Sequence, residues 1–304
     1  MNETAPENRT MGPKAVISAM LMCAIFGANI VAIKISLRGM GPLTAAGIRF
    51  ALAAVAIAAW AIVTRRSFAL KKGQLGQLGI LSAVFLFQMM SFYTGVKHTA
   101  ASRGILLANL QPFIVLILAH IFLSSEKITA RKALGILAGF TGVVVLIMQQ
   151  HGITEEVRKG DFFVLAAVVL WASNAVYIKR IISEYKAFHI AFYPIAFITP
   201  FLFGAAFILE EPVAVHLDWS VVCALLYQGI VSAGAGFVVW NVLQKRYGVV
   251  TLHSFIFLVP ISGVTFSALV LDEAVTGMNF IVSLVLITLG ILLVNAGVGR
   301  ERGA

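Results

Sequence analysis

The sequence is dominated by ten long apolar runs that are separated by short polar connections. A helix of about 20 apolar residues can cross a bilayer, because all of its backbone hydrogen bonds are made inside the segment. Since 60% of the 304 residues are hydrophobic and only 12% are charged, the chain could not cover the surface of a soluble domain. We therefore predict an all-α polytopic membrane protein with spans at residues 14–33, 42–63, 76–97, 103–123, 131–149, 160–181, 188–209, 218–241, 249–271 and 277–297.

The two ends of the chain are short and polar. Residues 1–12 are expected to form a disordered cytoplasmic tail, and residues 299–304 a second cytoplasmic tail. The first apolar run has no small-residue cleavage site and is followed at once by another span, so we interpret it as a membrane anchor. Cys23 and Cys223 both fall inside apolar runs, where a free cysteine acts as a small hydrophobe, and no disulfide is expected.

The basic residues are distributed unevenly between the two sides of the predicted membrane. With ten spans, both termini share a side with the connections after spans two, four, six and eight. That side carries 16 of the 23 Lys and Arg residues and the opposite side six, with Arg49 inside the second span. Because basic residues mark cytoplasmic loops, both termini are predicted to be cytoplasmic and the chain to lie in the inner (plasma) membrane. The net charge of +10 then reflects topology, and no nucleic-acid partner is expected.

The two halves of the chain resemble each other. Residues 26–34 read Phe-Gly-Ala-Asn-Ile-Val-Ala-Ile-Lys, and residues 171–179 read Trp-Ala-Ser-Asn-Ala-Val-Tyr-Ile-Lys. Pro112 and Pro260 occupy equivalent places in the fourth and ninth spans. Each half has an odd number of spans, so equivalent helices cross the membrane in opposite directions. We predict two inverted five-helix repeats, residues 13–150 and 158–298, the arrangement that gives secondary transporters two related conformations around a midplane site.

This pattern resembles the ten-helix EamA-type transporters of the drug/metabolite transporter superfamily. The resemblance covers residues 14–298 and rests on the two Asn-containing helix ends, the two prolines, the glycine-rich fifth and tenth spans, and Leu123-Ser124-Ser125-Glu126 with its counterpart Val270-Leu271-Asp272-Glu273. It implies a basket of helices 1–4 and 6–9 around a central cavity, with helices 5 and 10 to one side. It also implies export of amino acids, other metabolites or drugs.

Polar side chains deep in a span are costly in lipid and usually face the bundle interior. Asn29 and Asn174 are the first candidates for substrate contact, because pseudo-symmetry brings both to the central axis; hydrogen bonding between helices is the alternative. Three aromatic residues combine an apolar face with a polar tip, and they line the cavity or belong to interfacial belts: Trp171, Tyr93 and Trp240. Further neutral hydrogen-bonding groups are Gln88, Asn109, Gln111, Gln228 and Asn241.

Four residues are candidates for hinges or gates. Pro112 and Pro260 each remove a backbone hydrogen bond, which makes them flexing points of alternating access or static kinks. Lys34 and Lys179 close their helices, where they either gate the site or interact with the helix dipole and snorkel. Arg49 lies about two turns into the second span and is expected to snorkel outward, with an inward contact to a carboxylate as the alternative.

The oligomeric state is left as monomer or homodimer. Gly135, Gly139 and Gly142 form a small-residue face on the fifth span. We expect this face to pack inside the bundle, although such faces also form dimers.

All 13 Asp and Glu residues are placed in loops, tails or helix ends. A mid-membrane carboxylate that carries a proton or pairs with a cationic drug is therefore not expected. We predict a secondary transporter of small neutral or zwitterionic amphipathic metabolites, with amino acids first, working by alternating access; export is implied by the resemblance. The alternative is a broad exporter of drugs or toxic compounds, which a resistance profile would separate.

An enzyme is the competing class of protein. The sequence has no His-Glu-x-x-His, no Gly-x-Ser-x-Gly, no phosphate-binding loop and no paired carboxylates in mid-membrane. We therefore expect no catalytic residues, no metal and no cofactor, and the expected partners are a small-molecule substrate and the lipid bilayer.

Overall fold

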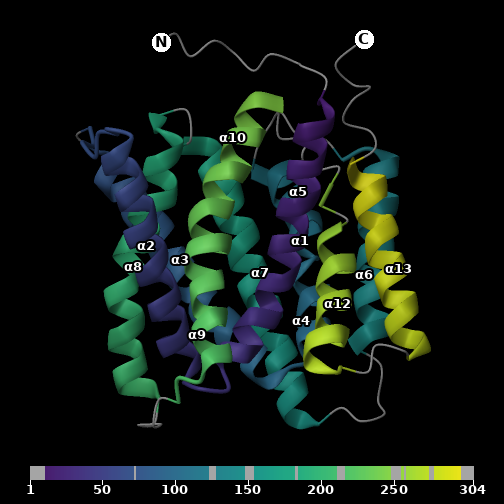
Figure 1. The fold of residues 1–304 in the computed structure, drawn as a ribbon. Helices are drawn as coiled ribbons and strands as arrows, with labels where there is room; N and C mark the ends of the chain where they lie inside the picture. Colours follow the sequence, from purple (N-terminus) through teal and green to yellow (C-terminus); the bar gives the residue numbers. More distant parts are fainter. Residues whose placement is uncertain are drawn as a thin grey trace.

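The computed structural model describes residues 11–71, 73–122, 128–147, 154–181, 184–210, 216–247, 255–256, 258–273 and 277–295. In these ranges the chain forms a bundle of helices, and the start of α1 and the end of α13 lie at the same end of it (Figure 1). We call this the terminal end, and the opposite one the distal end. The first half contains α1 (Pro13–Ser36), α2 (Pro42–Val63), α3 (Gln74–His98), α4 (Ala101–Ala108), α5 (Gln111–Phe122) and α6 (Ala130–Ile147). The second half contains α7 (Glu155–Ile181), α8 (Ala187–Leu209), α9 (Trp219–Leu226), the π-helix η2 (Tyr227–Gly236), α10 (Phe237–Tyr247), α12 (Leu258–Leu271) and α13 (Met278–Asn295).

Length and hydropathy make these helices membrane spans. Seven helical stretches in the described ranges are long and apolar enough to cross a bilayer, with α4 joined to α5 and α9 to η2 and α10; α12 and α13 are shorter apolar helices. Large apolar side chains are exposed on the outside of the bundle, among them Val55, Phe207 and Leu269. Together with α6, the described helices make ten crossings, which confirms the predicted all-α polytopic fold.

Most helix limits lie within a few residues of the predicted spans. The largest differences are the end of α10 at Tyr247 instead of at residue 241 and the start of α12 at Leu258 instead of at residue 249. The α7 helix also begins earlier than predicted, at Glu155 instead of at residue 160. Glu155 and Glu156 occupy its first turn, where negative charge interacts favourably with the helix dipole. The polar stretch predicted as a connection is therefore the first part of a helix.

Contacts at the distal end show the direction of the helices of the first half. The Nζ of Lys34, near the end of α1, donates to the carbonyl of Lys97 at the end of α3, 3.1 Å away. The carboxylate of Glu210, just after α8, accepts hydrogen bonds from the backbone N–H groups of Leu43 and Thr44 at the start of α2. The ends of α1, α3 and α8 and the start of α2 are therefore all distal.

The α4 and α9 helices also start at the distal end, and carboxylates cap both. The Glu273 carboxylate, just after α12, accepts from the backbone N–H groups of Ala101 and Ser102 at the start of α4, at 2.7 and 2.8 Å. Asp218 caps α9 through its own side chain, and hydrogen bonds from Ser220 and Val221 hold the pKa of its carboxyl below the ordinary value.

The terminal end shows that the second half is inverted. The amide nitrogen of Gln74, at the start of α3, donates to the carbonyl of Glu184 between α7 and α8, 2.6 Å away. The His189 ring, at the start of α8, lies 3.0 Å from the carbonyl of Ser67 beyond the end of α2. Hence α7 ends where α1 begins, and α8 runs opposite to α2. The predicted pair of inverted five-helix repeats is confirmed.

The helices of the two halves pack in pairs that follow the same symmetry. The α2 helix packs along α8 and α6 along α13, and each of these pairs is its own symmetry equivalent. The α1–α12 pair corresponds to the packing of α7 against α4 and α5 in the other half. The α3–α7 pair corresponds in the same way to the packing of α1 against α9 and η2. The two halves therefore pack against each other through two self-symmetric interfaces and through two kinds of interface that each occur twice.

Glycines let three of these pairs approach closely. A β-carbon at Gly27 of α1 would lie 2.8 Å from the backbone nitrogen of Gly263 in α12, and one at Gly95 of α3 would lie 2.8 Å from the carbonyl of Gly160 in α7. In the third pair, a β-carbon at Gly290 of α13 would lie 2.6 Å from the carbonyl of Gly135 in α6. The predicted small-residue face on α6 therefore packs inside the bundle, as expected.

Both predicted prolines follow a tightened turn of the chain. Before Pro112, the backbone N–H of Leu110 donates to the carbonyl of Leu107 at 3.0 Å, and this turn separates α4 from α5. Before Pro260, the N–H of Leu258 donates to the carbonyl of Phe255 at 2.9 Å. Proline cannot donate the next helical hydrogen bond, which explains the two irregular turns. Flexing at these positions remains a prediction.

The π-helix η2 is a feature that hydropathy did not predict. A β-carbon at Gly234 would lie 3.1 Å from the carbonyl of Gly229, and one at Gly236 would lie 3.0 Å from the carbonyl of Val231. Each of these carbonyls is five residues earlier in the chain, the spacing of a π-helix. Glycine at these positions therefore permits the wider helix.

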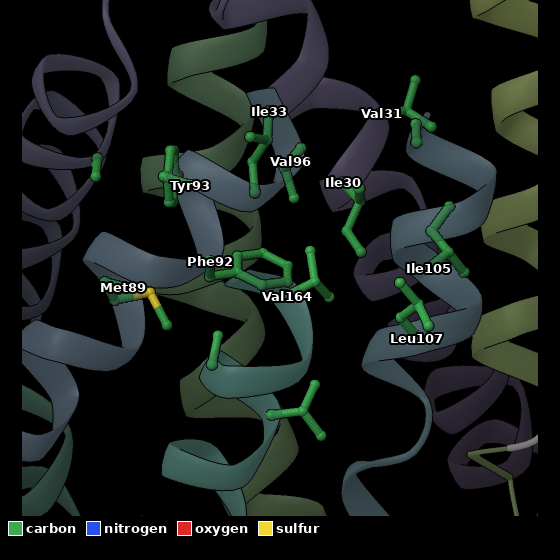
Figure 2. Close-up of a cluster of buried hydrophobic side chains, with 14 of the residues drawn as sticks. Ile30, Val31, Ile33, Met89, Phe92, Tyr93, Val96, Ile105, Leu107 and Val164 are labelled. Atoms are coloured by element: carbon green, nitrogen blue, oxygen red, sulfur yellow. The ribbon is translucent and has the colours of Figure 1, made fainter. Parts of the chain in front are cut away.

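The hydrophobic core lies where α1, α3, α4 and α7 meet. Ile30, Phe92, Ile105 and Val164 come from these four helices and are buried in one cluster (Figure 2). The cluster therefore joins the two repeats.

Candidate functional site

A cavity of about 140 Å³ lies between α3, α7, α8 and the start of α10. It contains three of the predicted site residues, Gln88, Trp171 and Asn174. The rest of its lining is apolar: Leu81, Phe85, Ala175, Ile178, Ile190, Ala191, Pro194, Ile195 and Phe237. Most of these residues lie in the first part of α3 and α8 and the last part of α7, so the cavity is nearer the terminal end. Protein cavities of similar size can hold a benzene ring.

Buried amide oxygens without a hydrogen-bond donor mark the cavity and its surroundings. Gln88 and Asn174 are 2% and 5% exposed, and neither Gln88 Oε1 nor Asn174 Oδ1 has a donor in the described part of the chain. Asn29 Oδ1 in α1 also has no donor among the described residues, with the residue 9% exposed, but Asn29 does not line this cavity. Leaving such an oxygen unpaired costs about 1–3 kcal/mol, so these groups are suited to receive donors from a ligand.

Trp171 gives the cavity an aromatic wall. It is partly exposed and lies edge-on to Phe92, with ring centroids 6.4 Å apart. An indole ring combines a large apolar face with one hydrogen-bond donor. The cavity therefore offers an apolar surface next to acceptor oxygens, which suits an amphipathic ligand that carries N–H donors.

Two other predicted residues, Tyr93 and Gln228, form a buried hydrogen-bonded chain instead of lining the cavity. The Tyr93 hydroxyl donates to Gln228 Oε1 at 2.9 Å and accepts from Nη1 of Arg49 at 3.1 Å. The amide nitrogen of Gln228 donates to the Ala32 carbonyl at 3.0 Å and to the Ser36 hydroxyl at 3.2 Å. This Arg49 network joins α2, α3, η2 and α1.

Arg49 does not snorkel outward, contrary to the sequence-based expectation. It is 7% exposed, and its guanidinium lies over the ring of Phe50, 5.1 Å from the centroid. Phe50 in turn contacts Phe85 of the cavity wall at a centroid distance of 5.4 Å. Packing of α2 against α3 and η2 covers the side chain, so that it cannot reach either membrane surface.

The other predicted site residues lie elsewhere. Asn109 is buried, and its side-chain nitrogen donates to the carbonyl of Ile105 at 2.8 Å, which accounts for it as part of the break between α4 and α5. Gln111 is half-buried in the first turn of α5. Trp240 packs edge-on against Phe26, with centroids 5.6 Å apart, outside the cavity lining. The side chain of Asn241 lies outside the described residues.

The predicted gating cations are only partly placed. Lys34 donates to the carbonyl at the end of α3, which fits the interaction with the helix dipole. The side chain of Lys179 lies outside the described residues, and so does Glu126, the counterpart of Glu273.

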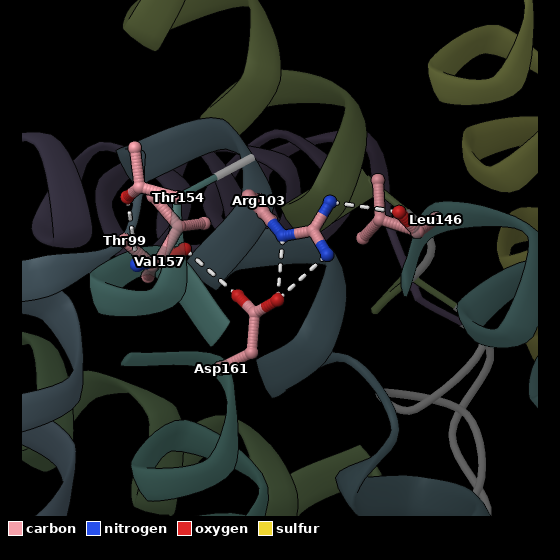
Figure 3. A network of polar contacts seen from close by, with 6 residues as sticks. All are labelled: Thr99, Arg103, Leu146, Thr154, Val157 and Asp161. Carbon is pink, nitrogen blue, oxygen red and sulfur yellow. Dashed lines mark hydrogen bonds and ion pairs between the residues drawn. The ribbon is translucent and has the colours of Figure 1, made fainter. Parts of the chain in front are cut away.

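A buried ion pair, which sequence reasoning missed, helps close the distal end. Nε and Nη2 of Arg103 in α4 lie 2.7 and 2.6 Å from Oδ2 of Asp161 in α7 (Figure 3). Thr99 donates to the other Asp161 oxygen at 2.8 Å, and Arg103 also donates to the carbonyl of Leu146 at the end of α6 at 2.7 Å. One buried pair therefore ties α4, α6 and α7 together.

Asp161 corrects the expectation that every carboxylate would sit in a loop, a tail or at a helix end. It is 4% exposed and lies inside α7, because that helix begins earlier than predicted. It is nevertheless level with the first turn of α4, and Arg103 neutralises it. None of the described carboxylates lines the cavity.

A second and larger hollow, of about 380 Å³, lies between α2 and the η2–α10 segment. Its lining is Ala56, Ile57, Trp60, Ile230, Gly234, Ala235, Val238 and Val239. Trp60 supplies the only polar side-chain atom in this lining, so the hollow cannot orient a polar ligand. In the described part of the chain, no group of three or more His, Cys, Asp and Glu side chains is placed to hold a metal ion.

Inverted repeats of membrane-spanning helices around a cavity are typical of one class of protein, the multi-pass membrane transporters. Comparison with known proteins then identifies the family. The profile of the EamA-like transporter family matches residues 13–148 and again residues 158–296, and the chain belongs to this family.

Individual relatives match over nearly the whole chain. The sequence is 28% identical over 289 residues to the "Probable amino-acid metabolite efflux pump" of Escherichia coli (strain K12). This alignment covers 91% of this chain and 94% of that protein. It is 29% identical over 279 residues to the protein of the same name from Salmonella typhimurium, and this alignment covers 88% of this chain and 91% of that protein. A solved crystal structure at 17% identity matches with a TM-score of 0.68 over 92% of this chain and 98% of that one, which shows a common fold.

Proposed function

We propose that this membrane transporter exports small zwitterionic amphipathic metabolites, with amino acids as the first class, by alternating access. The observation that carries the proposal is the pairing of Gln88 and Asn174, two buried amide oxygens without donors, with the aromatic wall of Trp171 in one cavity. An α-ammonium group supplies N–H donors for these oxygens, and an apolar side chain fits the remaining wall. The printed names of the Escherichia coli and Salmonella relatives support the same substrate class.

The direction of transport is proposed from topology. The side of the membrane that holds both termini carries 16 of the 23 basic residues, which supports a cytoplasmic terminal end and a location in the inner membrane. The cavity is nearer this end, and the distal end is bridged by Glu210, Glu273 and the Arg103–Asp161 pair. These positions fit a conformation that receives substrate from the cytoplasm and is closed on the other side.

The cavity assignment is tested by efflux of labelled phenylalanine from preloaded cells. We expect Gln88→Ala combined with Asn174→Ala to slow efflux by about tenfold, the effect of losing a buried hydrogen bond to a charged group. Ser173→Ala is the matched control, because Ser173 is exposed and its hydroxyl donates to the carbonyl of Val169 in its own helix. Efflux at the wild-type rate from the double variant, at equal expression, would remove these residues from the site.

The alternative function, broad export of drugs, is separated by a resistance profile in an efflux-deficient host. Cationic compounds fit this protein less well, because no described carboxylate lines the cavity and the buried Arg49 repels cations. Protection against many unrelated cations without amino-acid efflux would favour the alternative.

A further inference from the structure

Among the described residues, Arg49 is a buried cation without a counter-charge. No carboxylate of the described residues lies within ion-pair distance of it, whereas the other buried arginine, Arg103, is paired with Asp161. Nη1 of Arg49 donates to a neutral hydroxyl, that of Tyr93, and Nε is buried without an acceptor in the described part of the chain. An unpaired charge at this depth is among the most costly groups in a membrane protein, so it needs a function to explain it.

The surroundings of Arg49 hold it ready for an anion. Tyr93 gives its own proton to Gln228, so only a lone pair of its oxygen faces the guanidinium. Phe50 supports the guanidinium plane from one side. A guanidinium fixed in this way, with N–H donors still free, has the geometry that binds carboxylates in a bidentate manner.

Arg49 is also connected to the cavity. Phe85 lines the cavity and contacts Phe50, so one pair of aromatic rings links the cavity to the guanidinium. Arg49 lies about two turns from the distal start of α2, whereas the cavity is nearer the terminal end. Along the bundle axis, Arg49 therefore lies on the distal side of the cavity.

We propose that Arg49 is a carboxylate-binding site, reached from the cavity past the Phe50–Phe85 pair, and that it selects substrates that carry a carboxylate. This rests on the proposed function, which it deepens: the cavity amides receive the ammonium group first, and Arg49 receives the carboxylate after the substrate has moved past the two rings. Cations without a carboxylate are rejected by charge.

The test uses three ligands that share one ring and differ only in charge: phenylalanine, 3-phenylpropionate and phenethylamine. Binding is measured as the ligand-dependent rise in the melting temperature of the purified full-length protein in detergent. We expect the wild type to respond to phenylalanine and 3-phenylpropionate and not to phenethylamine. Arg49→Gln should weaken the binding of both carboxylates by about 10- to 100-fold, the range for a lost charged hydrogen bond, and Arg49→Lys should lie between the two.

A matched control and a second readout separate binding from folding. Arg38→Gln makes the same chemical change at an exposed arginine of the distal end and should bind like the wild type. Because an unpaired buried charge is itself costly, Arg49→Gln should melt without ligand at or above the wild-type temperature. If this variant does not fold, Arg49→Lys and the wild-type ligand series decide the question.

Other outcomes contradict either the Arg49 site or the proposed transport of zwitterions. The Arg49 site is wrong if 3-phenylpropionate binds Arg49→Gln as tightly as the wild type, if phenethylamine binds the wild type as well as the acids do, or if the wild type responds to neither acid. Arg49-dependent binding of 3-phenylpropionate without any response to phenylalanine would keep the Arg49 site and remove the zwitterion function. Binding of phenylalanine that is independent of Arg49 would keep the zwitterion function and remove the Arg49 site.

Discussion

Replacement of Asp161 by alanine is expected to lower the free energy of unfolding by about 3–5 kcal/mol. The side chains of Arg103 and Asp161 are 7% and 5% exposed, so the variant leaves a guanidinium buried without its counter-charge. Thr99 and the end of α6 lose their link to α7 at the same time. The loss is measured as the unfolding midpoint of the purified protein and as its monodisperse fraction in size-exclusion chromatography.

Two further variants control this result. The double variant Arg103→Met and Asp161→Leu removes both charges together and should recover most of the stability, because neither charge then has to be desolvated. Glu155→Ala breaks an exposed pair with Lys159 in the same helix and should change stability by less than about 0.5 kcal/mol. An Asp161→Ala protein as stable as Glu155→Ala would show that the buried pair does not hold the distal end together.

Gly290→Ala is expected to cost about 2–3 kcal/mol, near the upper end of the range for overpacking. Its β-carbon would lie 2.6 Å from the carbonyl of Gly135 and 2.9 Å from the backbone nitrogen of Gly139, so α6 and α13 would have to move apart as rigid backbones. The same stability measurement applies. Separation of this pair would weaken one of the self-symmetric contacts between the repeats.

Gly204→Ala and Gly79→Ala are the matched controls. Both glycines lie in helices, α8 and α3, and nothing lies within 4 Å of the β-carbon that alanine would add. Alanine has the higher helix propensity by about 1 kcal/mol, so these variants should be neutral or slightly more stable. A Gly290→Ala protein that behaved like them would contradict the close approach of α6 and α13.

Much of the fold could be predicted because it depends on local properties of the chain. Each span is a single apolar run, and the repeat made the opposite direction of the halves predictable from residues 26–34 and 171–179. The predicted start of α7 was wrong because residues 155–159 were interpreted as a polar loop, although acidic residues in a first turn favour a helix. The π-helix depends on glycines at positions where a β-carbon would approach the carbonyl five residues earlier, and hydropathy carries no information about this.

The site was harder to predict because its partners are far apart in the sequence. Gln88, Trp171 and Asn174 were identified as candidates from their polarity or aromatic character, but only the packing of α3 against α7 brings them to one cavity. Arg49 and Arg103 look alike in sequence, each a basic residue near a helix start. Arg103 pairs with Asp161, whereas Arg49 donates to Tyr93 and lies over Phe50, and this difference is set by tertiary packing.

The central claim, transport of zwitterionic amino acids, is tested most directly by exchange in liposomes that contain only the purified protein. Liposomes loaded with unlabelled phenylalanine should accumulate labelled phenylalanine, and excess leucine should compete, whereas phenethylamine should not. Protein-dependent exchange that is about tenfold slower in the Gln88→Ala and Asn174→Ala double variant is the predicted result. Absence of exchange for phenylalanine and leucine, together with protein-dependent transport of cationic drugs, would contradict it.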